Sequence, residues 1–104
     1  MVRMTLFARD GMLCGFRMSG HAGGQAGTDI VCAAISSAAL LAANTVTDVC
    51  GCHAVTRMRD GYLLLSVVTG DCDRAQETLE GLRLHMEELQ RQYPDRLHLD
   101  LLEI

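Results

Sequence analysis

The sequence contains no lysine, and its positive charge rests on nine arginines against thirteen acidic residues. The formal net charge is -4 at pH 7, and the arginines are scattered along the chain. A protein that holds nucleic acid needs a dense cationic surface to neutralise phosphates, and this composition does not supply one. We therefore expect no direct nucleic-acid partner.

The features of a secreted or zinc-stabilised domain are also missing. The five cysteines are an odd number, none has a zinc-finger spacing, and no signal peptide precedes the first strand-like run. A disulfide framework is therefore not expected. We expect a protein of the reducing cytoplasm that needs no metal or other cofactor.

Long hydrophobic runs are scarce as well. Residues 30–43 form fourteen consecutive positions without a charged side chain, whereas a membrane span needs about 20 apolar residues. This run is rich in alanine and serine, which predicts a buried helix and no membrane partner. A single domain covering residues 1–104 is expected, although such an uncharged helix is hard to bury in it, so we also predict a homodimer.

Two β-hairpins are predicted, each turning at the tripeptide Arg-Asp-Gly. Val2 to Ala8 alternates apolar and polar residues, and Met12 to Met18 follows Asp10-Gly11 with the same period. Fifty residues later, residues 52–58 and 62–69 flank the second turn. Alternation predicts half-buried strands, and Asp-Gly tolerates the positive φ of tight turns.

Each hairpin leads into a predicted helix. The first begins after Thr28 or Asp29, and the second, capped by Asp71 or Asp73, ends before Pro94. The second helix carries one apolar stripe, formed by Ala75, Leu79, Leu82, Met86 and Leu89. A last alternating run over residues 96–101 predicts a fifth strand. We therefore predict an α+β fold: a two-layer, largely antiparallel five-stranded sheet with two helices on one face, in the order β-β-α-β-β-α-β.

Cys32 falls at about the third position of the first predicted helix. The first turn of a helix carries unpaired backbone N–H groups and the positive end of the helix dipole, which favour a thiolate. A free cysteine has a pKa of about 8.5, and a helix start together with an imidazolium lowers such values into the range of about 3.5 to 7.5. Cys32 is therefore a candidate nucleophile.

His21 is the candidate partner of Cys32, eleven residues upstream. Four glycines, Gly20, Gly23, Gly24 and Gly27, surround or follow it, and they let the chain turn sharply toward the helix start. We predict a dyad in which Cys32 attacks, His21 is the general base, and backbone N–H groups of either the loop or the helix start form an oxyanion hole. Asp29 either caps the helix or orients the imidazole, and it would oppose a thiolate if it faced the sulfur.

Other interpretations of these residues stay open. Cys32 lies among Ile, Val and Ala and can be a core residue, in which case the chain is a non-catalytic homodimeric interaction module. Cys50, Cys52 and His53 carry soft metal-binding atoms, but their spacing matches no common zinc pair. The glycine-rich loop can cradle a phosphate, although it lacks the ending of a P-loop.

The segment from Gly20 to Ser36 resembles the signature of the ribosomal-processing cysteine protease family, Prp. The resemblance is carried by Gly20-His21-Ala22, a glycine-bearing loop and the run Asp29-Ile30-Val31-Cys32-Ala33-Ala34-Ile35-Ser36. It implies that His21 and Cys32 are the catalytic pair, with Asp29 and Ser36 as further motif residues. It also implies a cytoplasmic homodimer that removes the N-terminal extension of the bacterial ribosomal protein L twenty-seven, after a pair of phenylalanines. An interaction module would, by the same resemblance, associate with the ribosome.

Overall fold

The computed structural model describes residues 1–21 and 29–104. Within these ranges the chain forms, in order, strands β1 (Val2–Arg9) and β2 (Met12–Gly20), helix α1 (Ile30–Asn44), strands β3 (Ala54–Arg59) and β4 (Tyr62–Val67), helix α2 (Cys72–Gln92) and strand β5 (Leu97–Glu103). A π-helical turn, η1 (Thr45–Val49), continues α1, and a 3-10 turn, η2 (Thr69–Asp71), precedes α2. The predicted order of elements is confirmed.

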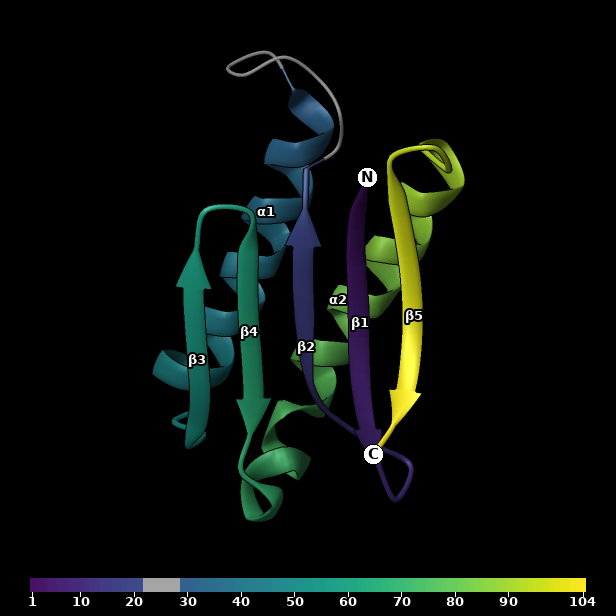
Figure 1. Cartoon of the computed structure of the whole chain (residues 1–104). Coiled ribbons are helices and arrows are strands. Elements are labelled where there is room, and N and C mark those ends of the chain that lie inside the picture. Colours follow the sequence, from purple (N-terminus) through teal and green to yellow (C-terminus); the bar gives the residue numbers. More distant parts are fainter. Residues whose placement is uncertain (22–28) are drawn as a thin grey trace.

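The five strands form one mixed sheet in the order β3-β4-β2-β1-β5. Neighbouring strands are antiparallel except for β1 and β5, which are parallel because α2 crosses the sheet between β4 and β5. Both helices cover the same face of the sheet (Figure 1). The predicted two-layer α+β architecture is confirmed, with β3 and β5 as the edge strands.

The core lies between the sheet and the two helices. Alternate residues of β1, beginning with Val2 and Met4, are buried in this core, as the sequence pattern predicts. The whole predicted stripe of α2 is buried. From α1, Ile35 and Ala39 are fully buried, and the small side chain of Ala39 lets the helix approach the strands closely. This packing fixes the start of α1 against one end of the sheet.

The continuous helical segment formed by α1 and η1 is longer than the sequence analysis expected. It runs from Ile30 to Val49, and by length and composition these twenty residues are enough to cross a membrane. The run at residues 30–43 predicted a shorter helix, because polar residues follow it. Asn44 and the threonines of η1 nevertheless continue the helix. A core helix of a soluble protein passes the same test, and the buried face of α1 packs on the sheet. The helix is therefore weak evidence for a membrane.

Candidate active site

Asp29 caps the start of α1, which places Cys32 at the third helical position as predicted. The Asp29 carboxylate accepts a hydrogen bond from the backbone N–H of Cys32 at 2.9 Å, and the Asp29 carbonyl accepts one from Ala33 at 3.1 Å. Arg96 lies 3.9 Å from the same carboxylate oxygen. Of the two roles left open for Asp29, the capping role is the one observed.

The cap also limits where an oxyanion can be bound. The backbone N–H groups of Cys32 and Ala33 already donate to Asp29, so in this state neither is directed at a substrate. The prediction that helix N–H groups form the oxyanion hole therefore does not hold for these two groups. The loop that was the other predicted source of donors, with Gly23, Gly24 and Gly27, lies outside the described residues.

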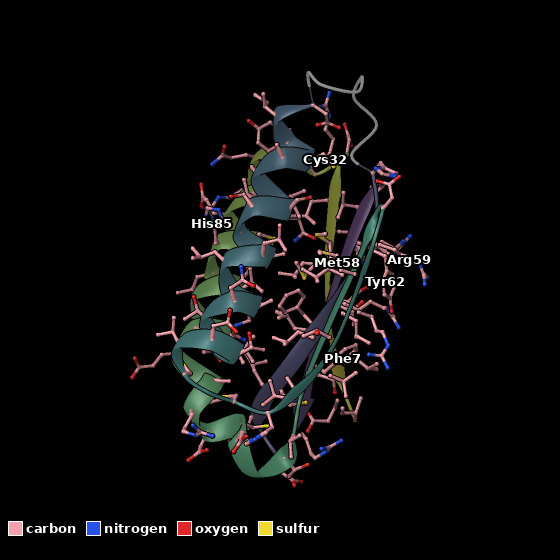
Figure 2. All side chains as sticks on the ribbon, turned by 90° about the vertical axis from the view of Figure 1, so that its left-hand side faces the viewer. Phe7, Cys32, Met58, Arg59, Tyr62 and His85 are labelled. Carbon is pink, nitrogen blue, oxygen red and sulfur yellow. The ribbon has the colours of Figure 1, made fainter. Side chains whose placement is uncertain are left out.

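His21 and Cys32 line one cavity of about 260 Å³, and Ser36, one turn further along α1, lines it too. Cys32 packs at the edge of the core, near the end of the layer between α1 and the sheet (Figure 2). His21 follows the last residue of β2 and is exposed. The structure thus brings four residues of the predicted site, Gly20 included, from a strand end and a helix to one cavity.

The wall of this cavity opposite α1 is mostly apolar. Met18, Leu63 and Val2 form it from the sheet, and Met58 of β3 contributes a side chain that is 71% exposed. Met58 pairs with Leu63 in the antiparallel register, so both side chains lie on the helix-covered face of the sheet. The cavity can therefore take an apolar group beside Cys32.

The β3–β4 turn forms the rim of the cavity, which the sequence analysis did not predict. Arg59, Asp60, Gly61 and Tyr62 all line it. The Arg59 guanidinium lies 4.3 Å from the centre of the Tyr62 ring, a cation–π contact (Figure 2). The only sequence signal was the second Arg-Asp-Gly tripeptide, and it indicates a turn without showing what the turn packs against.

Gly20 directs the chain from β2 into His21. It has φ +95°, and a Cβ there would collide with the carbonyl oxygen of Met1, so glycine is required. The Gly20 N–H donates to the carbonyl of Gly61 at 2.9 Å. The backbone just before His21 is thus held between the start of β1 and the β3–β4 turn.

A second, wider groove continues from this cavity along α1 and β3. Its volume is about 640 Å³, and it shares Leu40, Met58 and Leu63 with the cavity that holds Cys32. Further along it, Val55 and Thr56 of the edge strand face the groove with Asn44 and Thr47 of the helical segment. The two hollows together give an elongated surface beside the candidate nucleophile.

Comparison with known proteins identifies this arrangement. The family model described as cysteine protease Prp matches residues 1–98. The chain belongs to the Prp cysteine protease family. It is accordingly a cysteine protease of a family that acts in ribosomal processing. No curated protein matches the sequence.

Solved structures match nearly the whole length of this chain. The chain is 28% identical to SMU.848 from Streptococcus mutans, covering all of this chain and 96% of that one, with a TM-score of 0.86. The ribosomal processing protease Prp from Staphylococcus aureus, with a covalently linked product peptide, is 24% identical over 97% and 99% of the two chains, with a TM-score of 0.88. The same protease with a substrate peptide is 23% identical over the same shares, with a TM-score of 0.84. The latter two likenesses establish the shared fold.

The other cysteines of this Prp family member sit in different surroundings from Cys32. All five are free, and Cys14, Cys52 and Cys72 are buried. Burial raises the pKa of each of these three thiols above its usual value. Cys32 and Cys50 are only half-buried, which leaves these two as the accessible thiols.

The alternative metal site around Cys50, Cys52 and His53 is not supported. His53 directs its backbone N–H and its ring Nδ1 at the Asp71 carboxylate, at 2.7 and 3.0 Å. Within residues 1–21 and 29–104, no three metal-binding side chains lie close enough to hold an ion. Gly51, with φ +68°, follows the last helical turn as a glycine cap.

Asp71 differs from its predicted role as the cap of α2. It occupies the N-cap position, but its side chain makes no capping hydrogen bond. Instead, its carboxylate binds His53 and, at 2.8 Å, the Arg74 guanidinium. Asp71 is the last residue of the 3-10 turn η2, and its carboxylate accepts the His53 N–H from the chain that leads into β3.

Proposed function

We propose that this Prp family member is an endopeptidase in which Cys32 is the nucleophile and His21 the general base. The observation that carries the proposal is that both residues, which match the family motif, line one cavity at the start of α1. Asp29 fixes the backbone of Cys32, and Gly20 fixes the chain that leads to His21. The end of β2 and the start of α1 are therefore held at one cavity.

The proposed reaction is acyl transfer through a thioester. His21 takes the thiol proton as the Cys32 sulfur attacks the peptide carbonyl carbon, and it returns the proton to the leaving amine when the C–N bond breaks. Water then attacks the thioester with His21 again as base, which releases the carboxylic acid product and restores the thiol. Ser36 lies one helical turn beyond Cys32 and lines the same cavity, where its hydroxyl can bind the substrate backbone.

The proposed substrate is the N-terminal extension of ribosomal protein L twenty-seven, cleaved after a pair of phenylalanines. The apolar wall beside Cys32 suits an apolar residue next to the scissile bond, and the adjoining groove suits an extended peptide. A net charge of -4 favours approach of a basic ribosomal protein. The bound peptides in the related Staphylococcus aureus protease support the same class of substrate.

Cleavage of a synthetic peptide that spans the end of this extension tests the proposal. We expect wild-type protein to cut it, and Cys32→Ala and His21→Ala to lose at least about a thousandfold in kcat/KM. Cys50→Ala, which removes the other half-buried thiol, is the matched control and should cleave normally. Equal cleavage by wild type and Cys32→Ala would overturn the proposed nucleophile and favour a non-catalytic module.

We further propose a cytoplasmic homodimer in which a second copy covers part of the outer face of α1. Leu41 on this face is 70% exposed, and it lines an apolar groove of about 520 Å³ between α1 and α2. Sedimentation should give a dimer at micromolar concentration, and Leu41→Arg should shift the protein toward monomer. A wild-type monomer at that concentration would contradict the dimer without affecting the proposed chemistry.

A further inference from the structure

The imidazole of His21 rests directly on the backbone of the β3–β4 turn. A Cβ built at Gly61 would lie 2.8 Å from His21 Nε2, closer than Cβ atoms approach a neighbour in proteins, and 3.2 Å from Cε1. Only a glycine therefore leaves room for the ring where it lies. The contact involves Nε2, one of the two ring nitrogens through which an imidazole exchanges protons.

The same turn also holds the backbone that precedes the histidine. The carbonyl of Gly61 accepts the hydrogen bond from Gly20, and Ser19 pairs with Tyr62 in the sheet register. The strand order places β4 beside β2, so the β3–β4 turn meets the end of β2. Gly61 thus accepts a hydrogen bond from the chain just before His21, and its Cα lies against the His21 ring.

We propose that Gly61 is a positioning residue that sets where the His21 imidazole lies over the cavity of Cys32. The inference rests on the proposed function, because it assigns Gly61 a role through His21. The three atoms nearest to a Cβ at Gly61 all belong to the His21 ring, so a side chain there would displace the ring from this position. Displacements of about 1 Å between reacting groups lower rates by about a hundredfold.

The chain contains a matched control for this substitution. Gly11 ends the other Arg-Asp-Gly turn, which also joins two paired strands through two residues. Its φ of +79° is close to the +69° of Gly61, but a Cβ at Gly11 would meet nothing within 4 Å. The two turns lie at opposite ends of the sheet (Figure 1). Alanine therefore strains the backbone in both turns, and only at Gly61 does it reach the histidine.

The experiment compares Gly61→Ala, Gly11→Ala and His21→Ala with wild type. The readouts are the thermal midpoint, kcat and KM for the peptide, and the pH dependence of Cys32 alkylation by iodoacetamide, resolved by mass. We expect both glycine variants to lose similar thermal stability. Only Gly61→Ala should lower kcat, by about 10- to 100-fold with KM changed by less than about twofold. Its alkylation profile should shift from that of wild type toward that of His21→Ala.

Two results distinguish failure of the positioning role of Gly61 from failure of the proposed function. If His21→Ala has an altered alkylation profile and low activity but Gly61→Ala behaves as Gly11→Ala does, the positioning role is wrong and the proposed dyad stands. If His21→Ala cleaves and reacts like wild type, the proposed function fails and the role of Gly61 fails with it. Should Gly61→Ala not fold, Gly61→Asn brings a Cβ to the same place in a residue that tolerates positive φ, with Gly11→Asn as its control.

Discussion

Asp29 and Cys32 are joined across the first turn of α1 by a 2.9 Å hydrogen bond from the Cys32 N–H to the Asp29 carboxylate. The Asp29 side chain is only 11% exposed, so this cap is protected from water. This half-buried carboxylate puts a negative charge beside the candidate nucleophile Cys32. Arg96, 3.9 Å away, offsets part of that charge.

We expect Asp29→Ala to destabilise the protein by about 0.5–2 kcal/mol, because it removes the side-chain acceptor at the helix start. Asp29→Asn keeps an oxygen acceptor and should cost only a few tenths of a kcal/mol. Urea denaturation of the three proteins measures both values. Equal loss in the two variants would show that the charge of Asp29, and not its capping hydrogen bond, stabilises this end of α1.

Acid should weaken the fold through Asp71. The backbone N–H of His53 and the Arg74 guanidinium hold the pKa of the Asp71 carboxyl well below its usual range. A carboxyl with a lowered pKa in the folded state stabilises that state above its unfolded pKa of about 3.9, and the stabilisation is lost as the pH falls through the folded value. The thermal midpoint of wild type should therefore fall progressively below about pH 4.

Asp71→Asn tests this pH dependence. We expect the variant to melt lower than wild type at pH 7 and the difference to narrow as the pH falls toward 2. Asp73→Asn, an exposed carboxylate two residues further on, is the matched control and should follow wild type. A constant difference between Asp71→Asn and wild type over this pH range would show that the stabilisation is not linked to ionisation of Asp71.

The five cysteines should differ clearly in their rates of alkylation. Cys14, Cys52 and Cys72 are buried with raised pKa values, so they should react last in the folded protein. At mildly acidic pH we expect Cys32 to be modified well before Cys50, which is half-buried but lies far along the chain from the candidate histidine. Peptide mapping by mass spectrometry gives the order, and similar rates at Cys32 and Cys50 would count against an activated thiol.

The local parts of this fold are readable from the sequence. Alternating apolar residues predicted both hairpins, the apolar stripe predicted the buried face of α2, and Asp29 predicted the start of α1. Each of these features depends on residues that are close together in the chain. The family motif likewise lies in one short segment. His21 and Cys32 were therefore predictable as a pair, and the structure places both at one cavity.

The features that could not be predicted from the sequence depend on contacts between segments that are distant in the chain. The β3–β4 turn reaches the site only because β4 pairs with β2, and no local pattern encodes that neighbour. Asp71 or Asp73 was expected to cap α2, but the Asp71 carboxylate instead accepts a hydrogen bond from His53, eighteen residues earlier. Tertiary hydrogen bonds override local capping preferences when they satisfy the same acceptor in a better position.

Gly15 and Gly81 should respond in opposite ways to alanine. Gly15 has φ +154° beside a bulge in the β1–β2 register, and a Cβ there would collide with the backbone carbonyl of Leu65 in the neighbouring strand. Gly15→Ala should therefore destabilise the protein by about 3 kcal/mol or more. Gly81 lies within α2 with nothing within 4 Å of such a Cβ, so Gly81→Ala should stabilise it by about 1 kcal/mol. Urea denaturation checks both, and a mild loss at Gly15 would mean that β2 and β4 can separate locally without unfolding the sheet.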